Sequence, residues 1–330
     1  MLRFFKSNSI GLVFILPLLV LLIWSDIFGV KEDNFVPLPY SMPAYALVMK
    51  VMPNLIVSGI VAMLLIIVQA FYLVYINVVY NFISQRTYLT SLLFVLISSA
   101  FLNLHYLHPA IIANIFVLFT IVEIFSSYRQ PKVYKATFNA GFWVAVAGLF
   151  YINANFLILF VLISLLVLHT FNWREWTAAL IGFSIPYAIT LFLYYFFDKW
   201  TDLEHIIDAI VEFHSPKWHW PLAYYLYSGL LLALGIISIL KLSSTYSNNK
   251  VSTRSYFTLF TTQLSLLTLV FIFVPFASIE VIVLMAVPLS YLMSNYYLSK
   301  GNNWIQQISF SILLVGFIFF YLEKFFNLGA

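Results

Sequence analysis

Three acidic residues near the start of the chain have the type and spacing that proton transfer or cation binding requires. Asp26 ends the first long apolar run, and Glu32 and Asp33 follow within a short polar segment. A carboxylate at the end of an apolar helix can take a proton from a hydroxyl group or coordinate a cation. We therefore predict Asp26, Glu32 and Asp33 as catalytic residues. The alternative is that Asp26 only ends a helix and that the other two acids are solvated.

A second candidate is the pair His105 and His108, which flanks Tyr106 and precedes Pro109. Two histidines three residues apart can share one helical face, where they could bind a phosphate group or move a proton. No third ligand lies nearby in the sequence, and the HExxH and GxSxG motifs are absent, so we predict no metal site. No cofactor is identified. An ordinary polar turn is the alternative.

Five further residues complete the predicted substrate-binding set. Asn153 and Asn155 form a polar hinge between two short apolar runs. Lys199 and Lys217 are cations beside aromatic residues, which suits a phosphate group but equally suits an interfacial belt. Glu280 stands near the start of a late apolar run, where an acid is costly unless it faces protein or water.

The composition requires a membrane to position these residues. The chain has 330 residues, of which 63% are hydrophobic and only 8% are charged. Its mean hydropathy is +0.98. Such a chain could not cover a soluble globule with polar surface, so we predict an all-α polytopic membrane protein, with residues 1–330 forming a single transmembrane domain.

A transmembrane helix needs about 20 apolar residues, and polar turns divide the chain into eleven predicted spans. Their approximate ranges are Ile10–Gly29, Met52–Tyr80, Leu89–Leu104, Pro109–Ser126, Thr137–Ile152, Phe156–Thr170, Trp176–Phe197, Pro221–Leu240, Tyr256–Pro275, Ile279–Tyr297 and Trp304–Tyr321. Two interfacial helices are predicted on the outer face. One is Met42–Lys50, and the other is the amphipathic stretch Thr201–Phe213 within the outer segment 198–220.

The charge distribution predicts the orientation. With the N-terminus inside and the C-terminus outside, eleven of the sixteen Lys and Arg residues lie on the inner side and ten of the twelve acids on the outer side. This is the positive-inside bias of a bacterial cytoplasmic membrane protein. No basic run is dense enough for nucleic-acid binding.

These features resemble the GT-C superfamily of membrane glycosyltransferases, which use polyprenyl-phosphate sugars. The likeness covers about residues 1–200 and is architectural. It rests on many spans with short loops, an acid after the first helix, an interfacial segment and a His-bearing second outer loop. The stretch from Arg86 to Pro186 adds a basic inner loop, Ala140-Gly141, Trp173-Arg174 and Gly182.

The resemblance implies an inverting sugar transfer at the outer face. Asp26, or else Glu32 or Asp33, would take the acceptor's proton. The cations at His105, His108, Lys199 and Lys217 would stabilise the departing lipid phosphate. No Arg lies outside to hold a phosphate in a bidentate manner, so a degenerate relative is included in this hypothesis.

Two other functions stay open from the sequence. A lipid or solute transporter would use the Asn hinge as a broken-helix site. A noncatalytic subunit of a membrane complex would bury its apolar surface against other helices. The predicted partners are accordingly membrane lipid, a polyprenyl-phosphate sugar or other membrane subunits.

Overall fold

The computed structural model describes residues 11–25, 27, 41–52, 54–83, 85, 87–101, 105–130, 132–168, 172–212, 222–246, 249–299 and 303–327. All regular structure in these ranges is helical, which confirms the all-α part of the predicted fold class. The elements are α2 (Gly11–Ile23), α3 (Pro43–Val51), α4 (Leu55–Tyr80), α5 (Leu89–Ser98), α6 (Pro109–Ser126), α7 (Tyr134–Phe150), η4 (Ile152–Phe156), α8 (Leu157–Leu168), α9 (Trp173–Phe196), α10 (Trp200–Glu212), α11 (Leu222–Ser244), α12 (Val251–Phe273), α13 (Val281–Leu298) and α14 (Asn303–Asn327).

Six of the described helices are long and apolar enough to cross a membrane: α4, α6, α9, α11, α12 and α13. The protein is therefore a helical membrane protein. Exposed aromatic side chains agree with a lipid-facing surface, since Phe192, Tyr195 and Phe196 on α9 are 62%, 76% and 68% exposed. Each of the eleven predicted runs overlaps a helix. The number of spans stays a prediction, because α5 has only 10 residues, about 15 Å of helix.

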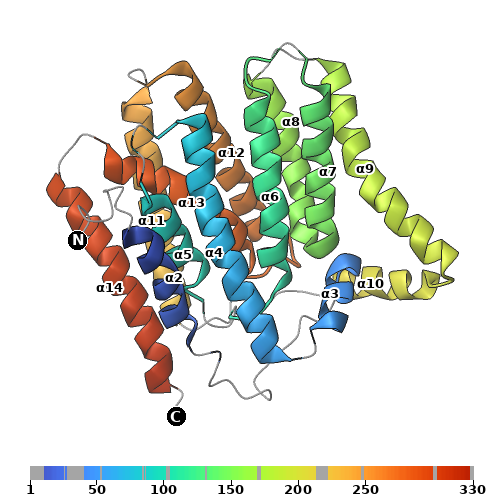
Figure 1. The fold of residues 1–330 in the computed structure, drawn as a ribbon, viewed down its shortest axis with the longest axis horizontal. Helices are drawn as coiled ribbons and strands as arrows, with labels where there is room; N and C mark the ends of the chain where they lie inside the picture. Colours follow the sequence, from blue (N-terminus) through green and yellow to red (C-terminus); the bar gives the residue numbers. More distant parts are fainter. Residues whose placement is uncertain are drawn as a thin grey trace.

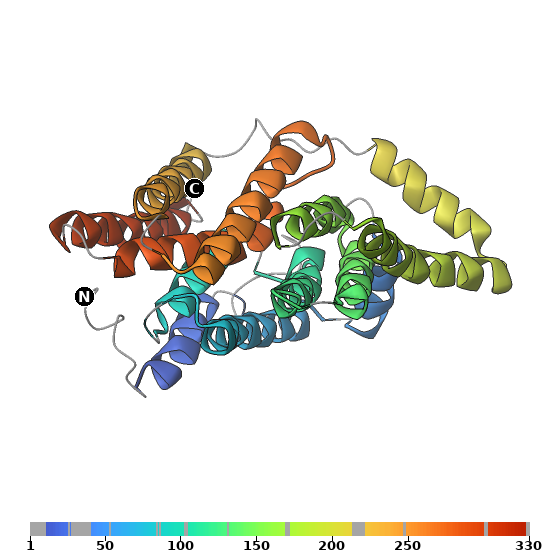
Figure 2. The same ribbon diagram turned by 90° about the horizontal axis from the view of Figure 1, so that it is seen from above.

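The centre of the bundle is α13, which packs against α5, α6, α11 and α12 (Figures 1 and 2). Every residue of α5 is buried. The helix has no charged residue, and two of its hydroxyl groups bond to neighbouring helices: Thr90 Oγ1 donates to Ser294 Oγ of α13 at 2.9 Å, and Ser91 Oγ donates to the Ala70 carbonyl of α4 at 2.6 Å.

Buried polar side chains join neighbouring helices across this core. The Asn114 Nδ2 of α6 donates to Gln69 Oε1 of α4 at 2.8 Å, and Gln69 Nε2 donates to the Ile111 carbonyl. Tyr291 of α13 donates to the Leu73 carbonyl of α4 at 2.7 Å. In lipid, such hydrogen bonds and close packing replace the hydrophobic drive that holds soluble helices together.

Two glycines bring α7 and α9 into close contact. A Cβ atom at Gly141 would overlap the Ala179 carbonyl, and one at Gly182 would overlap the Phe138 carbonyl. Small residues at the crossing point allow the two backbones to approach. Beyond this contact α9 leans away from the bundle toward α10 (Figure 1).

Helices α3 and α10 correspond to the two predicted interfacial segments, and both lie at one end of the bundle (Figure 1). Helix α10 begins at Trp200, whose indole Nε1 donates to Glu204 Oε1 at 2.9 Å. The side chain of Glu204 is therefore used within the first turn.

Candidate functional site

The turn that carries the two histidines joins α5 to α6 and is fixed from two sides. Tyr45 of α3 donates its hydroxyl to the Leu107 carbonyl at 2.8 Å. The Leu107 amide donates to Ser58 Oγ of α4 at 3.1 Å. Pro109 at the first helical position then starts α6, where its missing N–H costs nothing.

His105 is used in packing. Its ring stacks on Trp24 at 4.4 Å between centroids, and its Nε2 lies 3.0 Å from the Ser99 carbonyl. The Trp24 indole donates to Ser99 Oγ at 2.9 Å. Both rings are buried. These contacts hold the His105 ring against Trp24 and the end of α5, so the ring is not open to bind a ligand.

His108 is fully buried, and neither ring nitrogen has a hydrogen-bond partner. Burial, and secondarily the nearby His105, lowers the pKa of His108 to about 3. The imidazole is therefore neutral at physiological pH, with one donor and one acceptor unused. Unpaired buried groups of this kind are costly, so His108 is a candidate binding residue.

Glu280 lies immediately before α13, outside the helix that can cross the membrane, and is only 2% exposed. Tyr106 donates to its Oε1 at 3.4 Å, a long hydrogen bond, while Oε2 has no partner. Burial raises the pKa of the Glu280 carboxyl to about 8, and the Tyr106 hydrogen bond partly opposes this rise. A carboxyl tuned toward neutral pH suits proton transfer.

The structure thus joins two predicted residues through one that was not predicted. The rings of Tyr106 and His108 lie 5.7 Å apart, and the Tyr106 hydroxyl reaches Glu280. Tyr106 stood between the two predicted histidines, but nothing local in the sequence indicated its distant partner. His108 and Glu280 are buried and Tyr106 between them is half-buried, and we call these three residues the buried triad.

The Asn hinge forms the short 3-10 helix η4. Asn153 is fully buried, and both polar atoms of its amide lack a partner. Asn155 behaves differently, since its Oδ1 accepts a hydrogen bond from Tyr187 of α9. Ile152 and Phe276 belong to one small apolar cluster, and Phe276 lies four residues before Glu280. The hinge therefore lies at the same end of the bundle as the buried triad.

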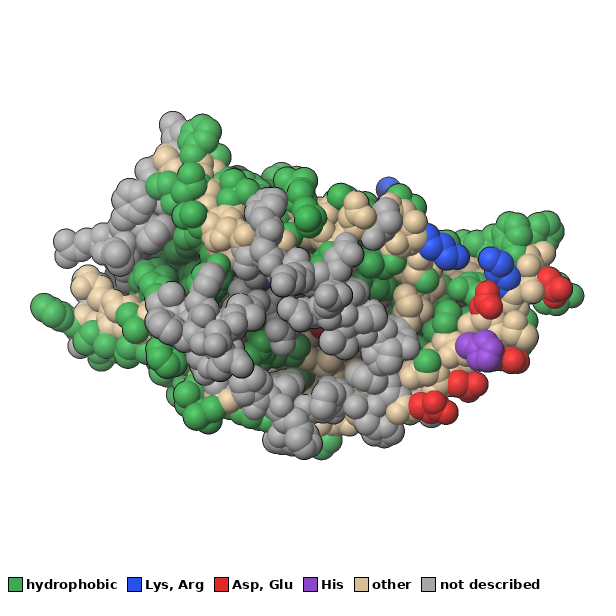
Figure 3. All heavy atoms as spheres, turned by 90° about the horizontal axis from the view of Figure 1, so that it is seen from below, with side chains coloured by type: hydrophobic (Ala, Val, Ile, Leu, Met, Phe, Trp, Pro, Cys, Tyr) green, Lys and Arg blue, Asp and Glu red, His purple; other side chains and the backbone are tan. Residues whose placement is uncertain are grey.

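Lys199 is exposed at the corner between α9 and α10, and the structure does not bring it to the buried triad (Figure 1). Its backbone amide closes the helix end by donating to the Tyr194 carbonyl. The exposed face of α10 carries acids, which gather along one edge in Figure 3. Asp26, Glu32, Asp33 and Lys217 lie outside the described residues.

No group of three or more His, Asp or Glu side chains suited to a metal ion occurs within the described ranges. The buried triad has one acid and one available imidazole. It could bind a hydroxyl or phosphate group and transfer a proton.

Residues 30–328 match the model of a family of unknown function, DUF6427. The chain belongs to the DUF6427 family. No curated protein and no solved structure matches it. For this DUF6427 protein the match includes the buried triad and the Asn hinge, while Asp26 precedes the matched residues.

Proposed function

We propose that this DUF6427 protein is a GT-C-like glycosyltransferase, or a close derivative of one, that uses a polyprenyl-phosphate sugar at the outer face of a bacterial cytoplasmic membrane. The proposal includes eleven spans, an inner N-terminus and an outer C-terminus. It rests chiefly on Glu280, a buried acid with one unpaired oxygen at the end of the bundle that carries α3 and α10.

In the proposed reaction, the ionised Glu280 carboxylate takes the proton from the acceptor hydroxyl. The acceptor oxygen forms a bond to the anomeric carbon as the bond from that carbon to the phosphate oxygen breaks. The electron pair of that bond leaves with the polyprenyl phosphate. Neutral His108 donates a hydrogen bond to the departing phosphate, which a preorganised donor in a buried site stabilises effectively.

Asp26 is the alternative base, as implied by the GT-C resemblance. Purified protein in lipid nanodiscs, supplied with polyprenyl-phosphate sugars and acceptors, distinguishes the two acids. We expect Glu280→Gln to lower turnover by about 10²–10⁴-fold, the usual contribution of a general base. Asp208→Asn, on exposed α10, is the matched control and should leave turnover unchanged.

If Glu280→Gln turns over normally and Asp26→Asn does not, the base is Asp26 and the assignment of Glu280 is wrong. If neither variant nor the unmodified protein consumes any lipid-linked sugar from the panel, the enzyme proposal fails. A partner that co-purifies with this inactive protein would then favour the noncatalytic subunit.

Asn153 specifically supports transport as the second candidate. Its buried, unpaired amide lies in a break between α7 and α8, and polar groups at helix breaks often bind substrate in transporters. Transport predicts that Asn153→Ala abolishes flux in proteoliposomes. Asn155→Ala tests the same hinge, but it also removes the hydrogen bond to Tyr187, so its thermal stability must be measured beside its flux.

A further inference from the structure

The second half of α9 and helix α10 project from the side of the bundle. The first half of α9 packs on α7, and Pro186 is the last buried residue of α9. No residue from 188 to 200 is buried, and α10 then returns toward α3 (Figures 1 and 2). We call residues 188–212 the arm. The proposed sugar transfer uses none of its residues.

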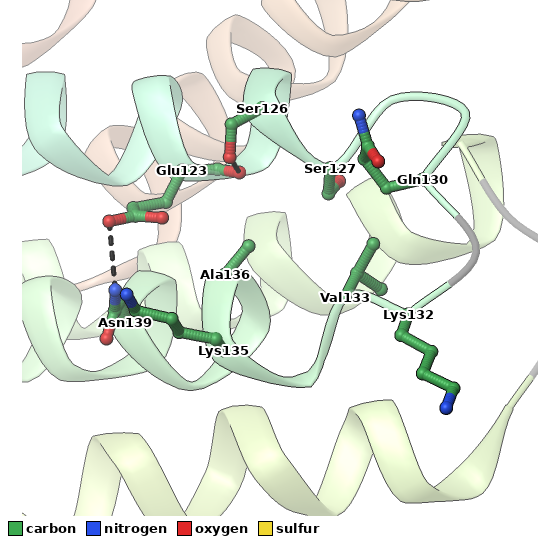
Figure 4. Close-up of a pocket in the computed structure, with 9 residues that line it drawn as sticks. All are labelled: Glu123, Ser126, Ser127, Gln130, Lys132, Val133, Lys135, Ala136 and Asn139. Atoms are coloured by element: carbon green, nitrogen blue, oxygen red, sulfur yellow. Dashed lines mark hydrogen bonds between the residues drawn. The ribbon is translucent and has the colours of Figure 1, made fainter.

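The arm is anchored at both of its ends. At its base, two glycines bring α7 and α9 into close contact. Helix α7 is joined in turn to α6, since Asn139 Nδ2 donates to Glu123 Oε1 at 3.0 Å (Figure 4). At its far end, Ile210 of α10 packs with Met42 in a small apolar cluster. The direction of the arm is therefore set by packing, while the helix between the two anchors is uncovered.

The end of α9 is uncovered on every side. Tyr195, Phe196 and Phe197 are 76%, 68% and 63% exposed. Successive helical residues point about 100° apart, so these three side chains face different directions. The rings contact one another, since the centroid of Phe196 lies 6.0 Å from that of Phe192 and 5.4 Å from that of Phe197. The arm thus presents an aromatic surface that the described part of the chain does not cover.

This surface has the area and the composition of a protein interface. Its large apolar side chains are between 45% and 76% exposed: Ile189, Leu191, Phe192, Leu193, Tyr195, Phe196, Phe197 and Trp200. Together they offer about 900 Å², against about 800 Å² that each partner buries in an interface of standard size. Aromatic residues are enriched in such interfaces. Lipid tails also cover apolar surface, so the neighbouring charges decide between the two.

The corner between α9 and α10 carries charges of both signs. Lys199 and Asp202 are exposed, and neither forms an ion pair within the described part of the chain. A two-fold dimer brings the same surface of two copies together. Lys199 of one protomer then faces the partner's Asp202, and the reverse pair forms on the other side of the axis. The corner is therefore complementary in charge to a second copy of itself, whereas lipid tails offer it no charge.

We propose that the arm binds the arm of a second copy of this chain, which makes the protein a homodimer. A two-fold axis along the membrane normal keeps both copies in the same orientation. The aromatic rings of the two α9 helices pack together, and Lys199 pairs across the axis with the partner's Asp202. In lipid, such packing and polar pairs hold helices together, because apolar area alone supplies no driving force.

Native mass spectrometry of the purified full chain, released from lipid nanodiscs, measures the dimer without any substrate. We expect the unmodified protein to be dimeric. Tyr195→Ala combined with Phe196→Ala should weaken the dimer about 100-fold, because four rings leave the interface. Ile308→Ala combined with Ile312→Ala is the matched control. These α14 side chains are 54% and 50% exposed, and their loss should leave the dimer intact.

Charge reversal tests the pairing across the axis. Lys199→Asp makes both positions acidic and Asp202→Lys makes both basic, so each variant alone should dimerise about tenfold more weakly. An equal mixture of the two should form heterodimers, since opposite charges then meet. Pairing within one chain cannot produce this result. A monomeric unmodified protein, a dimer that survives the loss of Tyr195 and Phe196, or a mixture without heterodimers would each overturn the proposal.

Discussion

Glu280 and His108 are buried polar residues whose side chains the surrounding helices leave incompletely paired. The second oxygen of Glu280 and both ring nitrogens of His108 lack partners. Each unpaired buried group costs about 1–3 kcal/mol. A bound substrate that supplies hydroxyl and phosphate groups would recover this cost, which is why the triad favours a binding or catalytic role.

The raised pKa of Glu280 predicts how sugar transfer depends on pH. The base must be ionised, so activity should rise with pH and reach half of its maximum near pH 8, where the Glu280 carboxyl titrates. Initial rates between about pH 6 and pH 9 check this. A profile that is flat across this range, or that falls with increasing pH, would rule out Glu280 as the base.

The same carboxyl predicts a stability change that needs no substrate. Its pKa is about 8 in the folded protein against an ordinary value of 4.5, so the folded state holds a proton that the unfolded state releases. The contribution of the Glu280 carboxyl to the free energy of unfolding is fully present below about pH 4.5 and is lost as the pH rises toward 8. The melting temperature of the unmodified protein should fall by a few degrees between about pH 6 and pH 9.

Glu280→Gln removes the titrating group while keeping a similar shape. Its melting temperature should change less over the same pH range. Scanning fluorimetry in one detergent compares the two proteins. Parallel curves would mean that Glu280 does not titrate as its burial implies.

Among the helices, α7 and α9 depend on a contact that only glycine permits. Adding a methyl group at Gly141 drives it into the Ala179 carbonyl, which the backbone cannot avoid without separating the helices. Asn155 and Tyr187 join the same region by a hydrogen bond. The packing of α7 against α9 thus also helps to hold the polar hinge in place.

Gly141→Ala should therefore destabilise the protein by about 1–3 kcal/mol, the usual cost of overpacking. The matched control is Gly229→Ala on α11, because nothing lies within 4 Å of the added Cβ atom. Since alanine favours helix by up to about 1 kcal/mol over glycine, this control should be neutral or slightly stabilising. Thermal unfolding of both variants measures the difference. Equal stability would show that α7 and α9 tolerate a wider separation.

For the molecule as a whole, the orientation in the membrane decides whether the buried triad faces the outer or the inner solution. The Lys and Arg bias predicts that the buried triad lies on the outer side of the membrane. The chain has no cysteine, so single cysteines can be introduced without removing any.

Asp208→Cys on α10 and Lys250→Cys before α12 test this orientation. We expect a membrane-impermeant maleimide to label the Asp208→Cys variant in intact spheroplasts. It should label the Lys250→Cys variant only after the membrane is permeabilised. Gel-shift labelling measures both. The reverse pattern would invert the topology and place the triad on the cytoplasmic side.

Local properties of the chain were enough to predict a helical membrane protein and to locate its apolar runs. Apolar length, turn residues and charge are all read along the sequence. Helices α3 and α10 also form where the sequence predicted them, at Met42–Lys50 and Thr201–Phe213, because the amphipathic period of the second segment is a local property too. The length of α5 was overestimated, since hydrophobicity continues past Ser98 while the helix ends there.

The contacts between polar residues depend on the packing of helices that are distant in the sequence. The sequence did not predict these contacts. Tyr106 and Glu280 are 174 positions apart, and no spacing rule links them. The two histidines have the same type and lie on the same turn, yet His105 stacks on Trp24 while His108 stays unpaired. The difference comes from the helices packed around the turn, because burial and the available partners set what a side chain can do.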